Sequence, residues 1–345
     1  MKIGITGGAG FIGGWCAAVA LDHGHDVVIM DRRATARRHP ALDVHPEGYE
    51  GMGDGGRLEL FVGDVLDDVA LTELGAHVDG IIHLAACLGT QETIANPRPA
   101  ALTNMLGGLN FLEAVSQYGI AGCYIGVGNH WMQNTYSISK TTVERFVHMF
   151  NAERGTKVNI VRLVNAYGPG QSMAPPFGPA KVRKITPAFI ARALTGAPIE
   201  IYGDGEQVSD MVHVRDGAEA LVRALEASHA GHLIDHPVEI GPTRSATVNE
   251  VAEEVVVAAM RNGLVQGRHL GKIPIRHLPM RPGETPGAVV SADWVTMREL
   301  GMDPDKLTDL RAGMNETVLW YAENWLPEYE QKIKNDVQRA EQAGS

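Results

Sequence analysis

The chain has 345 residues, of which 44% are hydrophobic, and its 41 acidic against 30 basic residues give a net charge of −11. This is a globular composition, long enough for one large domain or two closely packed ones, and the acidic balance argues against nucleic acid or an anionic membrane as a partner. The three cysteines, Cys16, Cys87 and Cys123, predict no disulfide framework or zinc knuckle, and the fourteen histidines lead us to predict no metal site. With no signal-peptide pattern and no apolar run of membrane-spanning length, we expect a cytoplasmic protein.

In the N-terminal half, short β-rich runs alternate with helical patterns, which is typical of a parallel sheet with crossover helices. The stretch 32–57 is rich in Arg, Gly, Pro and His and is expected to be a long surface loop. The predicted strands are residues 2–6, 26–30, 58–62, 80–84, 123–127 and 158–163, and the predicted helices are 11–22, 69–74, 100–118 and 136–153.

After Gly168 a Pro- and Gly-rich segment interrupts this alternation and marks a change of domain. Beyond it we predict helices at 185–195, 216–227, 248–261 and 307–334, short strands at 199–202, 238–240 and 273–277, and a disordered tail at 336–345. The whole pattern predicts an α/β fold, with a Rossmann-type doubly wound parallel sheet and a smaller α/β C-terminal lobe.

The first predicted strand runs directly into a glycine-rich turn that opens the first helix. Gly7, Gly10 and Gly13 allow a tight turn, close approach of the backbone to a pyrophosphate, and close packing of helix on strand. Asp31 follows the second strand, eighteen residues after Gly13, where a carboxylate accepts hydrogen bonds from the adenine ribose hydroxyls. The sequence therefore predicts a dinucleotide site rather than a purely structural turn.

Asp31 also bears on which dinucleotide binds, because its carboxylate repels a 2′-phosphate and so favours NAD over NADP. Four nearby arginines could neutralise such a phosphate and argue the other way. They are Arg32, Arg33, Arg37 and Arg38. We interpret them as a solvated loop face and predict NAD.

A second chemical signal is a YxxxK pattern, in which Tyr136 and Lys140 lie one helical turn apart on one face of a predicted helix. The ammonium is expected to lower the pKa of the phenol, so that the phenolate takes a proton from a substrate hydroxyl as hydride leaves. Isolated YxxxK patterns are usually surface pairs, but this one follows the fifth strand of a dinucleotide fold. It predicts a catalytic pair.

These motifs resemble the extended short-chain dehydrogenase/reductase family, and within it the NAD-dependent nucleotide-sugar epimerases and dehydratases. The resemblance covers residues 1 to about 325 and rests on motifs in order along the chain. They are TGGAGFIG at 6–13, Asp31, GDV at 63–65, HLAA at 83–86, NMLGGLN at 104–110, Tyr136 with Lys140, RLVNAYGP at 162–169, YGDG at 202–205, VHVRD at 212–216, RPGE at 281–284 and LG at 300–301.

The resemblance implies where the cofactor and the substrate bind. The residues expected to bind NAD are Gly7, Gly10, Phe11, Ile12, Gly13, Asp31, Arg32, Asp64, Val65, Leu84, Ala85, Ala86, Asn104, Tyr136, Lys140 and Leu163. Of these, Asp64 and Val65 would lie beside the adenine and Lys140 on the nicotinamide ribose. For a nucleotide-sugar substrate, it implies that Asn165 reaches the phosphates or the sugar and that Arg281 pairs with the diphosphate; Asn129 is a further candidate contact.

The resemblance also implies two lobes. An NAD-binding domain would take residues 1–168 and about 210–237, and a substrate-binding lobe would take 169–209 and 238–335. A homodimer formed through the helices at 100–118 and 136–153 is implied as well, although the apolar spacing of these helices suits an ordinary core face equally well.

The chain departs from this family at the end of the fifth strand, where a Ser or Thr normally stands well before the tyrosine. Here the sequence reads CYIGVGNHW at 123–131 and Tyr136 follows almost at once, so this hydroxyl is missing. The Thr-Asp-Glu run of the 4,6-dehydratases and the Glu of the sugar decarboxylases have no counterpart either, and both reactions are disfavoured because elimination needs an acid and a base beyond the tyrosine. Ser209 stands where the family commonly has a diphosphate-binding arginine, a role that Arg183 or Lys184 could take over.

We therefore predict an NAD-dependent epimerase acting at C4 of a nucleoside-diphosphate hexose through a transient keto intermediate, with Tyr136 as the base. The alternatives are a net sugar dehydrogenase or 4-keto reductase with exchangeable NAD(P), and a 4,6-dehydratase-like enzyme. A third is a non-catalytic dinucleotide-binding regulator, against which the intact Tyr136 and Lys140 argue.

Overall fold

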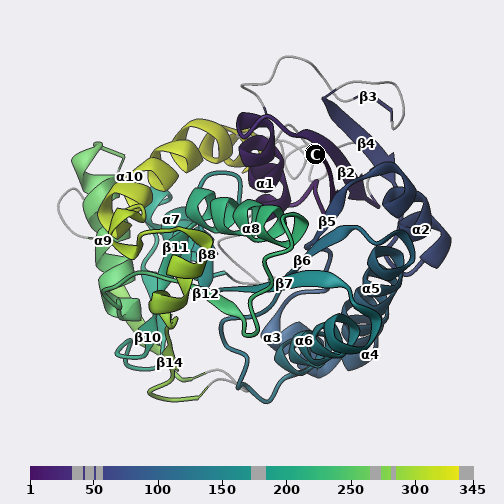
Figure 1. The fold of residues 1–345 in the computed structure, drawn as a ribbon. Coiled ribbons are helices and arrows are strands. Elements are labelled where there is room, and N and C mark those ends of the chain that lie inside the picture. The colour runs from purple at the N-terminus through teal and green to yellow at the C-terminus, as the bar shows by residue number, and fades with distance from the viewer. Residues whose placement is uncertain are drawn as a thin grey trace, which may run out of the picture.

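The computed structural model describes residues 1–32, 42, 50–51, 57–171, 184–264, 273–280 and 285–333. Its centre is an eight-stranded sheet with the strand order β12-β7-β6-β5-β1-β2-β4-β3, in which every neighbouring pair is parallel (Figure 1). The strands are β1 (Lys2–Thr6), β2 (Asp26–Asp31), β3 (Glu50–Gly51), β4 (Leu58–Val62), β5 (Gly80–His83), β6 (Ala121–Ile125), β7 (Lys157–Leu163) and β12 (Val238–Ile240). Their apolar runs are buried on both faces, as a parallel sheet covered by helices requires.

Two helical layers cover this sheet. On one face, α1 (Phe11–Asp22) and α8 (Val214–His229) share a core with the strands, and on the other face α2 (Asp68–His77), α5 (Gly107–Tyr118) and α6 (Thr135–Arg154) form a second core (Figure 1). The short helices α3 (Thr90–Ala95) and α4 (Pro97–Ala101) precede α5.

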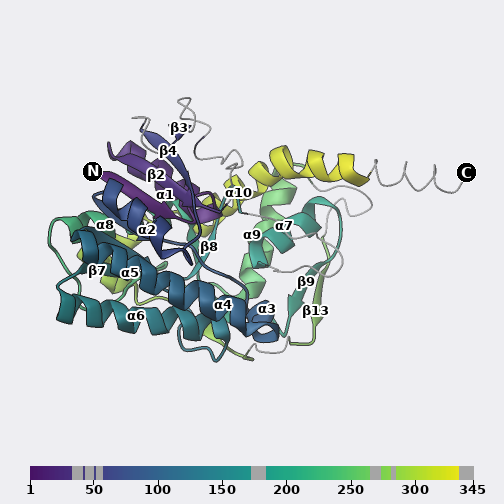
Figure 2. The same cartoon turned by 90° about the vertical axis from the view of Figure 1, so that its right-hand side faces the viewer.

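A smaller lobe with its own core lies beside the carboxyl ends of the sheet (Figure 2). It contains α7 (Ile185–Leu194), α9 (Val248–Arg261), α10 (Leu310–Trp320) and the parallel pair β9 (Ile199–Tyr202) and β13 (Ile275–Leu278). Two short parallel pairs join the lobes, β8 (Asn165–Tyr167) with β11 (Met211–His213) and β10 (Val208–Ser209) with β14 (Val289–Val290).

The α/β prediction is confirmed, and six predicted elements, β1, β4, β9, β12, α1 and α9, have the bounds expected. The predicted helix 100–118 is instead interrupted by a π-helical segment, Leu102–Leu106, between α4 and α5. A second π-helical segment, Tyr321–Trp325, follows α10 within the predicted helix 307–334. Apolar periodicity does not reveal these segments, because each is only five residues long and continues the helical path of its neighbours.

The expected domain boundary at 237 requires a correction at β12. This strand pairs with β7 in the large sheet, and the 3₁₀ segment Trp294–Leu300 supplies Met297 and Leu300 to the core beneath that sheet. The sequence after 237 therefore contributes to both lobes. Most of the predicted surface loop 32–57 and the tail 336–345 lie outside the described residues.

Among the helices that the structure describes, none is long and apolar enough to cross a membrane. In α6, Val143, Val147 and Phe150 are buried in the core. Packing within the chain therefore accounts for the apolar spacing of these three residues.

Candidate active site

The glycine-rich turn after β1 has the geometry that its sequence predicts. Gly7 has φ +68°, and a Cβ there would lie 3.0 Å from backbone atoms of Ala85. A Cβ on Gly13 would lie 2.5 Å from the Cα of Gly8, so the start of α1 packs directly on the turn. Only glycine fits at Gly7, because of its positive φ and the close Ala85 backbone. Only glycine fits at Gly13, because a Cβ would collide with Gly8.

The amino end of α1 suits an anionic ligand. Its N-cap is Gly10, no side chain caps the helix, and no acidic residue stands in its first turn. The helix dipole and the first-turn N–H groups therefore face the turn without a competing carboxylate from the chain. By this test the residues present fit the pyrophosphate of a dinucleotide.

The predicted adenosine end lies where β2 and β4 finish. Asp31 is the last residue of β2, and its carbonyl accepts a 3.0 Å hydrogen bond from the N–H of Gly63 just beyond β4. The side chain of Asp64 accepts from the N–H of Leu66 at 3.0 Å and lies 3.8 Å from the guanidinium of Arg32. Contact of these groups with the cofactor stays a prediction.

Val65, which is expected to lie beside the adenine, is only 6% exposed and packs against Gly107 at the start of α5.

Leu84, Ala85 and Ala86 form the loop after β5, which the chain holds by its backbone. The hydroxyl oxygen of Thr6 accepts from the N–H groups of Leu84 at 3.2 Å and Ala85 at 3.3 Å. This fixes the loop against the glycine-rich turn, next to Gly7.

Asn104 lies in the first π-helical segment and is 1% exposed. Its oxygen accepts from the N–H of Cys87 at 2.8 Å, and its amide donates to the carbonyl of Cys87 at 3.2 Å and the hydroxyl of Ser139 at 2.9 Å. Both amide protons are thus used within the chain. Asn104 positions the loop after β5 on the helix that carries the tyrosine, while direct contact with NAD remains a prediction.

Tyr136 and Lys140 are placed by α6, whose N-cap Asn134 accepts from the N–H of Ser137 at 2.9 Å. Burial raises the pKa of Tyr136 to about 12. Burial also lowers the pKa of Lys140 to about 7, against the opposing charge of Glu144. The Lys140 ammonium lies 4.1 Å from the centre of the Tyr124 ring, and Lys140 is 1% exposed.

The expected lowering of the tyrosine pKa by the lysine is therefore not found in the cofactor-free chain. Desolvation penalises the phenolate, and the same desolvation removes much of the charge from the lysine that would stabilise it. The pair has the expected position but a different electrostatic balance.

A buried ion pair that the sequence did not predict lies next to Lys140 on α6. Arg162 on β7 donates to both carboxylate oxygens of Glu144, at 3.1 and 2.6 Å, and to Glu239 at 3.0 Å. Glu144 follows Lys140 by one helical turn. No sequence signal marks this network, because its members come from a helix and two strands far apart in the chain.

These elements enclose one pocket of about 410 Å³ that runs from the start of α1 into the smaller lobe. Several predicted residues line it together: Phe11, Ile12, Asn129, Tyr136, Leu163 and Asn165. Among the described lining residues the only carboxylate is Glu200, and it is held by Arg192 at 2.6 Å. The loop after β6 contributes backbone, Asn129 and Met132, but no acid.

Three polar atoms in this pocket are buried without a hydrogen-bond partner in the described part of the chain. They are Oε1 of Gln171, Oγ1 of Thr186 and Oε1 of Gln207. Buried polar groups are normally satisfied, so unpaired ones in a pocket indicate a polar ligand. The sequence did not indicate these three residues, because none of them belongs to a motif and isolated glutamines and threonines are typical surface residues.

The substrate candidates divide between described and undescribed parts of the chain. Asn165 lines the pocket and donates to the hydroxyl of Ser209 at 3.0 Å and the carbonyl of Asp210 at 3.1 Å. Lys184 also lines the pocket. Arg281 and Arg183 lie outside the described residues.

A doubly wound sheet, a glycine turn opening a helix, and a pocket lined by Tyr136, one helical turn before Lys140, define a dinucleotide-dependent enzyme. The model of the NAD dependent epimerase/dehydratase family matches residues 3–241, and the chain belongs to this family, with NAD as its cofactor.

Known relatives of the chain cover most of its length and divide between activities. It is 26% identical to the dTDP-glucose 4,6-dehydratase of Mycolicibacterium smegmatis, over 95% of this chain and 96% of that one. It is 28% identical to the UDP-N-acetyl-alpha-D-glucosaminuronate decarboxylase of Bacillus cytotoxicus, over 73% and 78%. The crystal structure of the Thermus thermophilus UDP-glucose 4-epimerase in complex with NAD matches with a TM-score of 0.74 and 25% identity, over 94% of this chain and 100% of that one.

Proposed function

We propose that the chain is a nucleotide-sugar 4-epimerase, which oxidises C4 of a nucleoside-diphosphate hexose to a ketone and reduces it from the other face. The observation that carries the proposal is the pocket beside Tyr136, in which the one described carboxylate, Glu200, is already paired with Arg192. A dehydratase needs an acid and a base for the elimination of water in addition to the tyrosine. Epimerisation needs a single group that takes and returns one proton.

Tyr136 is that group in the proposal. Bound NAD would supply the hydride acceptor for the oxidation of C4 and, in its reduced form, the hydride donor for the reduction of the ketone. As a phenolate, Tyr136 would take the proton from the sugar hydroxyl and, as a phenol, give it back. Lys140, one turn later, would favour the phenolate when it is itself protonated. Asn129 takes the place of the missing Ser or Thr, because it lines the pocket and its oxygen accepts from the hydroxyl of Ser137 at 3.4 Å.

The substrate class is supported by the unpaired atoms of the smaller lobe. Gln171, Thr186 and Gln207 offer oxygens to the hydroxyl groups of a sugar. Asn165 is proposed to contact the sugar or the phosphates, and Arg281 to pair with the diphosphate. Ser209, already bonded to Asn165, does not supply the charge that an arginine would at this place.

A net sugar dehydrogenase or 4-keto reductase has the same requirement for one proton-transfer group. The two functions differ in their use of cofactor, because an epimerase regenerates its NAD in each cycle. Purified protein is incubated with UDP-glucose or dTDP-glucose, with no added nicotinamide nucleotide, and the sugars are separated after hydrolysis. Formation of the galactose epimer supports the proposal; turnover that requires added NAD and accumulates NADH overturns it in favour of a dehydrogenase.

The matched variants are Tyr136→Phe and Tyr118→Phe, since Tyr118 is 39% exposed at the end of α5. We expect Tyr136→Phe to lower kcat by at least about 10²-fold with NAD still bound, and Tyr118→Phe to leave it unchanged. Near-wild-type activity of Tyr136→Phe would contradict the assigned mechanism.

A homodimer is the proposed assembly. Leu102 and Leu106 near the start of α5 and Ile138 and Met149 on α6 are each more than a third exposed, so both helices present apolar side chains outward. Light scattering of the purified chain distinguishes a dimer from a monomer.

A further inference from the structure

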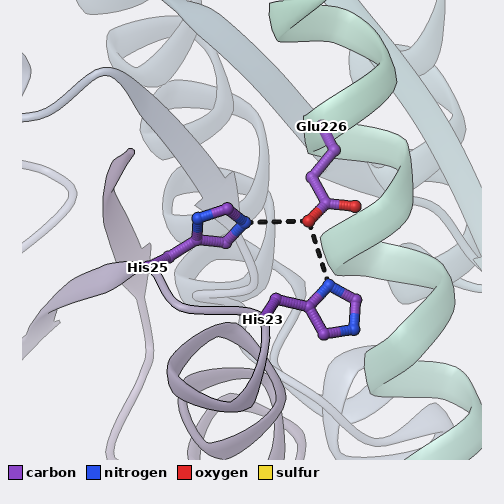
Figure 3. Close-up of side chains that lie close together, drawn as sticks. All are labelled: His23, His25 and Glu226. Atoms are coloured by element: carbon purple, nitrogen blue, oxygen red, sulfur yellow. Dashed lines mark hydrogen bonds and ion pairs between the residues drawn. The ribbon is translucent and has the colours of Figure 1, made fainter.

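Two histidines and a glutamate converge at the turn between α1 and β2 (Figure 3). His23 ends α1, His25 comes just before β2, and Glu226 projects from α8. One oxygen of Glu226 lies 2.9 Å from Nδ1 of His23 and 2.8 Å from Nε2 of His25. The three ligand atoms all lie within 4.8 Å of one another.

The turn that carries the histidines is fixed by the backbone. Gly24 between them has φ +84°, and the N–H groups of His23 and His25 donate to the carbonyls of Val19 and Ala20, both at 2.9 Å. These bonds hold both rings toward α8, where they reach the same carboxylate. The ligand atoms are therefore brought together by rigid elements rather than by a free loop.

The outer contacts of His23 suit a cation. Its Nε2 lies 3.1 Å from a carboxylate oxygen of Glu219, which is also on α8. Glu219 in turn forms an ion pair with Arg223 at 2.5 Å. Both ring nitrogens of His23 thus face carboxylates. A metal ion bound at Nδ1 would leave the Nε2–H to donate to Glu219, which is the carboxylate–histidine–metal arrangement of many metal sites.

We propose that His23, His25 and Glu226 bind a divalent transition-metal ion of the zinc class. Two imidazoles and one carboxylate are typical zinc ligands, whereas magnesium and calcium prefer oxygen alone. At zinc–ligand distances of about 2.0–2.1 Å, donor atoms in a tetrahedral site lie about 3.3 Å apart. Small movements from the observed 2.8 and 2.9 Å thus open the space for the ion. The side chains of His23, His25 and Glu226 are 26%, 15% and 34% exposed, so water can complete the coordination.

The position assigns the site a structural role. His23 lies at the opposite end of α1 from the glycine-rich turn, about 18 Å away along a twelve-residue helix. The ion would connect α8 to the turn between α1 and β2. The helices α1 and α8 already share one core. It would stabilise this layer without touching NAD.

The test is a calorimetric titration of Zn²⁺ into the untagged full-length protein, freed of metal and saturated with NAD, at about pH 8, where free histidine is neutral. We expect one Zn²⁺ per chain with a Kd in the micromolar range or below, and a rise in melting temperature of at least about 2 °C at saturation. Mg²⁺ should give neither.

Two variants remove ligands and one serves as control. Glu226→Gln keeps the shape of the side chain, and His23→Gln removes a ring; each should weaken Zn²⁺ binding by at least tenfold while NAD binding is retained. The control is His236→Gln, because His236 also lies between two carboxylates, Asp235 at 2.8 Å and Glu299 at 2.9 Å, but among the described residues these three side chains are not a group that could hold a metal ion. Equal Zn²⁺ affinity in Glu226→Gln and wild type, or loss of binding in His236→Gln, would overturn the proposal.

Discussion

At the scale of single residues, Lys140 shows how the site sets function against stability. Its ammonium is nearly fully buried, and Glu144, its nearest opposite charge on α6, is already bonded twice by Arg162. A cation so placed is costly in the free chain and becomes useful only when a phenolate or a ligand is beside it.

This leads to a prediction about Lys140→Met, which keeps the length of the side chain and removes its charge. Because burial lowers the pKa of Lys140 from 10.5 to about 7, the folded state holds this proton less tightly than the unfolded state. The destabilisation is fully present below about pH 7 and disappears as the pH rises toward 10.5. We expect Lys140→Met to raise the free energy of unfolding by about 1–4 kcal/mol at pH 7 and to abolish turnover.

The measurement is urea unfolding of the NAD-free protein at several pH values. Lys157→Met, at the exposed start of β7, is the control and should change stability by less than about 0.5 kcal/mol. A destabilised Lys140→Met protein at pH 7 would show that the ammonium is stabilised by contacts other than those described.

At the scale of elements, α6 is fixed to its neighbours by two ion pairs of similar length and different burial. Arg162 joins it to β7 through Glu144 at 2.6 Å, with side chains 15% and 5% exposed. Arg154 joins it to α5 through Glu113 at 2.7 Å, with side chains 43% and 57% exposed. Water screens the second pair, whereas removing Glu144 leaves the buried Arg162 guanidinium with Glu239 as its remaining carboxylate among the described residues.

We therefore expect Glu144→Gln to lower the free energy of unfolding by about 3 kcal/mol or more, and Glu113→Gln by less than about 1 kcal/mol. Urea midpoints at constant m-value measure both. Losses of the same size in the two variants would contradict the role given to burial.

At the scale of the whole molecule, local patterns predicted the parts that local forces determine. The strand, glycine turn and helix over residues 2–22, and the capped helix α9, could be identified because apolar period, turn residues and caps all agree there. The predicted NAD turn and the Tyr136–Lys140 pair rest on such segments.

Contacts between distant segments could not be predicted in the same way. The pairing of β8 with β11, the Arg162–Glu144 network and the contact of Glu226 with the His23–His25 turn each join segments that are separate in the sequence. The pKa values of Tyr136 and Lys140 depend on burial, which a spacing does not report. The expected boundary at 237 misplaced β12 for a similar reason, because a three-residue strand shows its partner only in the folded sheet.

The pocket between the lobes gives the last prediction, which concerns Thr186 near the start of α7. Its hydroxyl is buried, lines the pocket and has no partner among the described residues, so Thr186→Val removes no hydrogen bond from the free chain. We expect the free energy of unfolding to stay within about 0.5 kcal/mol of wild type or to increase. The Kd for the nucleotide sugar should rise about three- to tenfold, as the sugar loses a hydrogen-bond partner.

Thr156→Val is the matched control, because Thr156 is 5% exposed and donates to Asn151 at 2.7 Å, at a position that does not line the pocket. It should lower the free energy of unfolding by about 1 kcal/mol and leave the Kd unchanged. Thermal unfolding and calorimetric titration with the substrate of the wild-type enzyme separate the two effects. If Thr186→Val were destabilised as much as Thr156→Val and bound substrate normally, its hydroxyl would have a partner within the protein, and the unpaired atoms of the smaller lobe would no longer indicate how this enzyme holds its sugar.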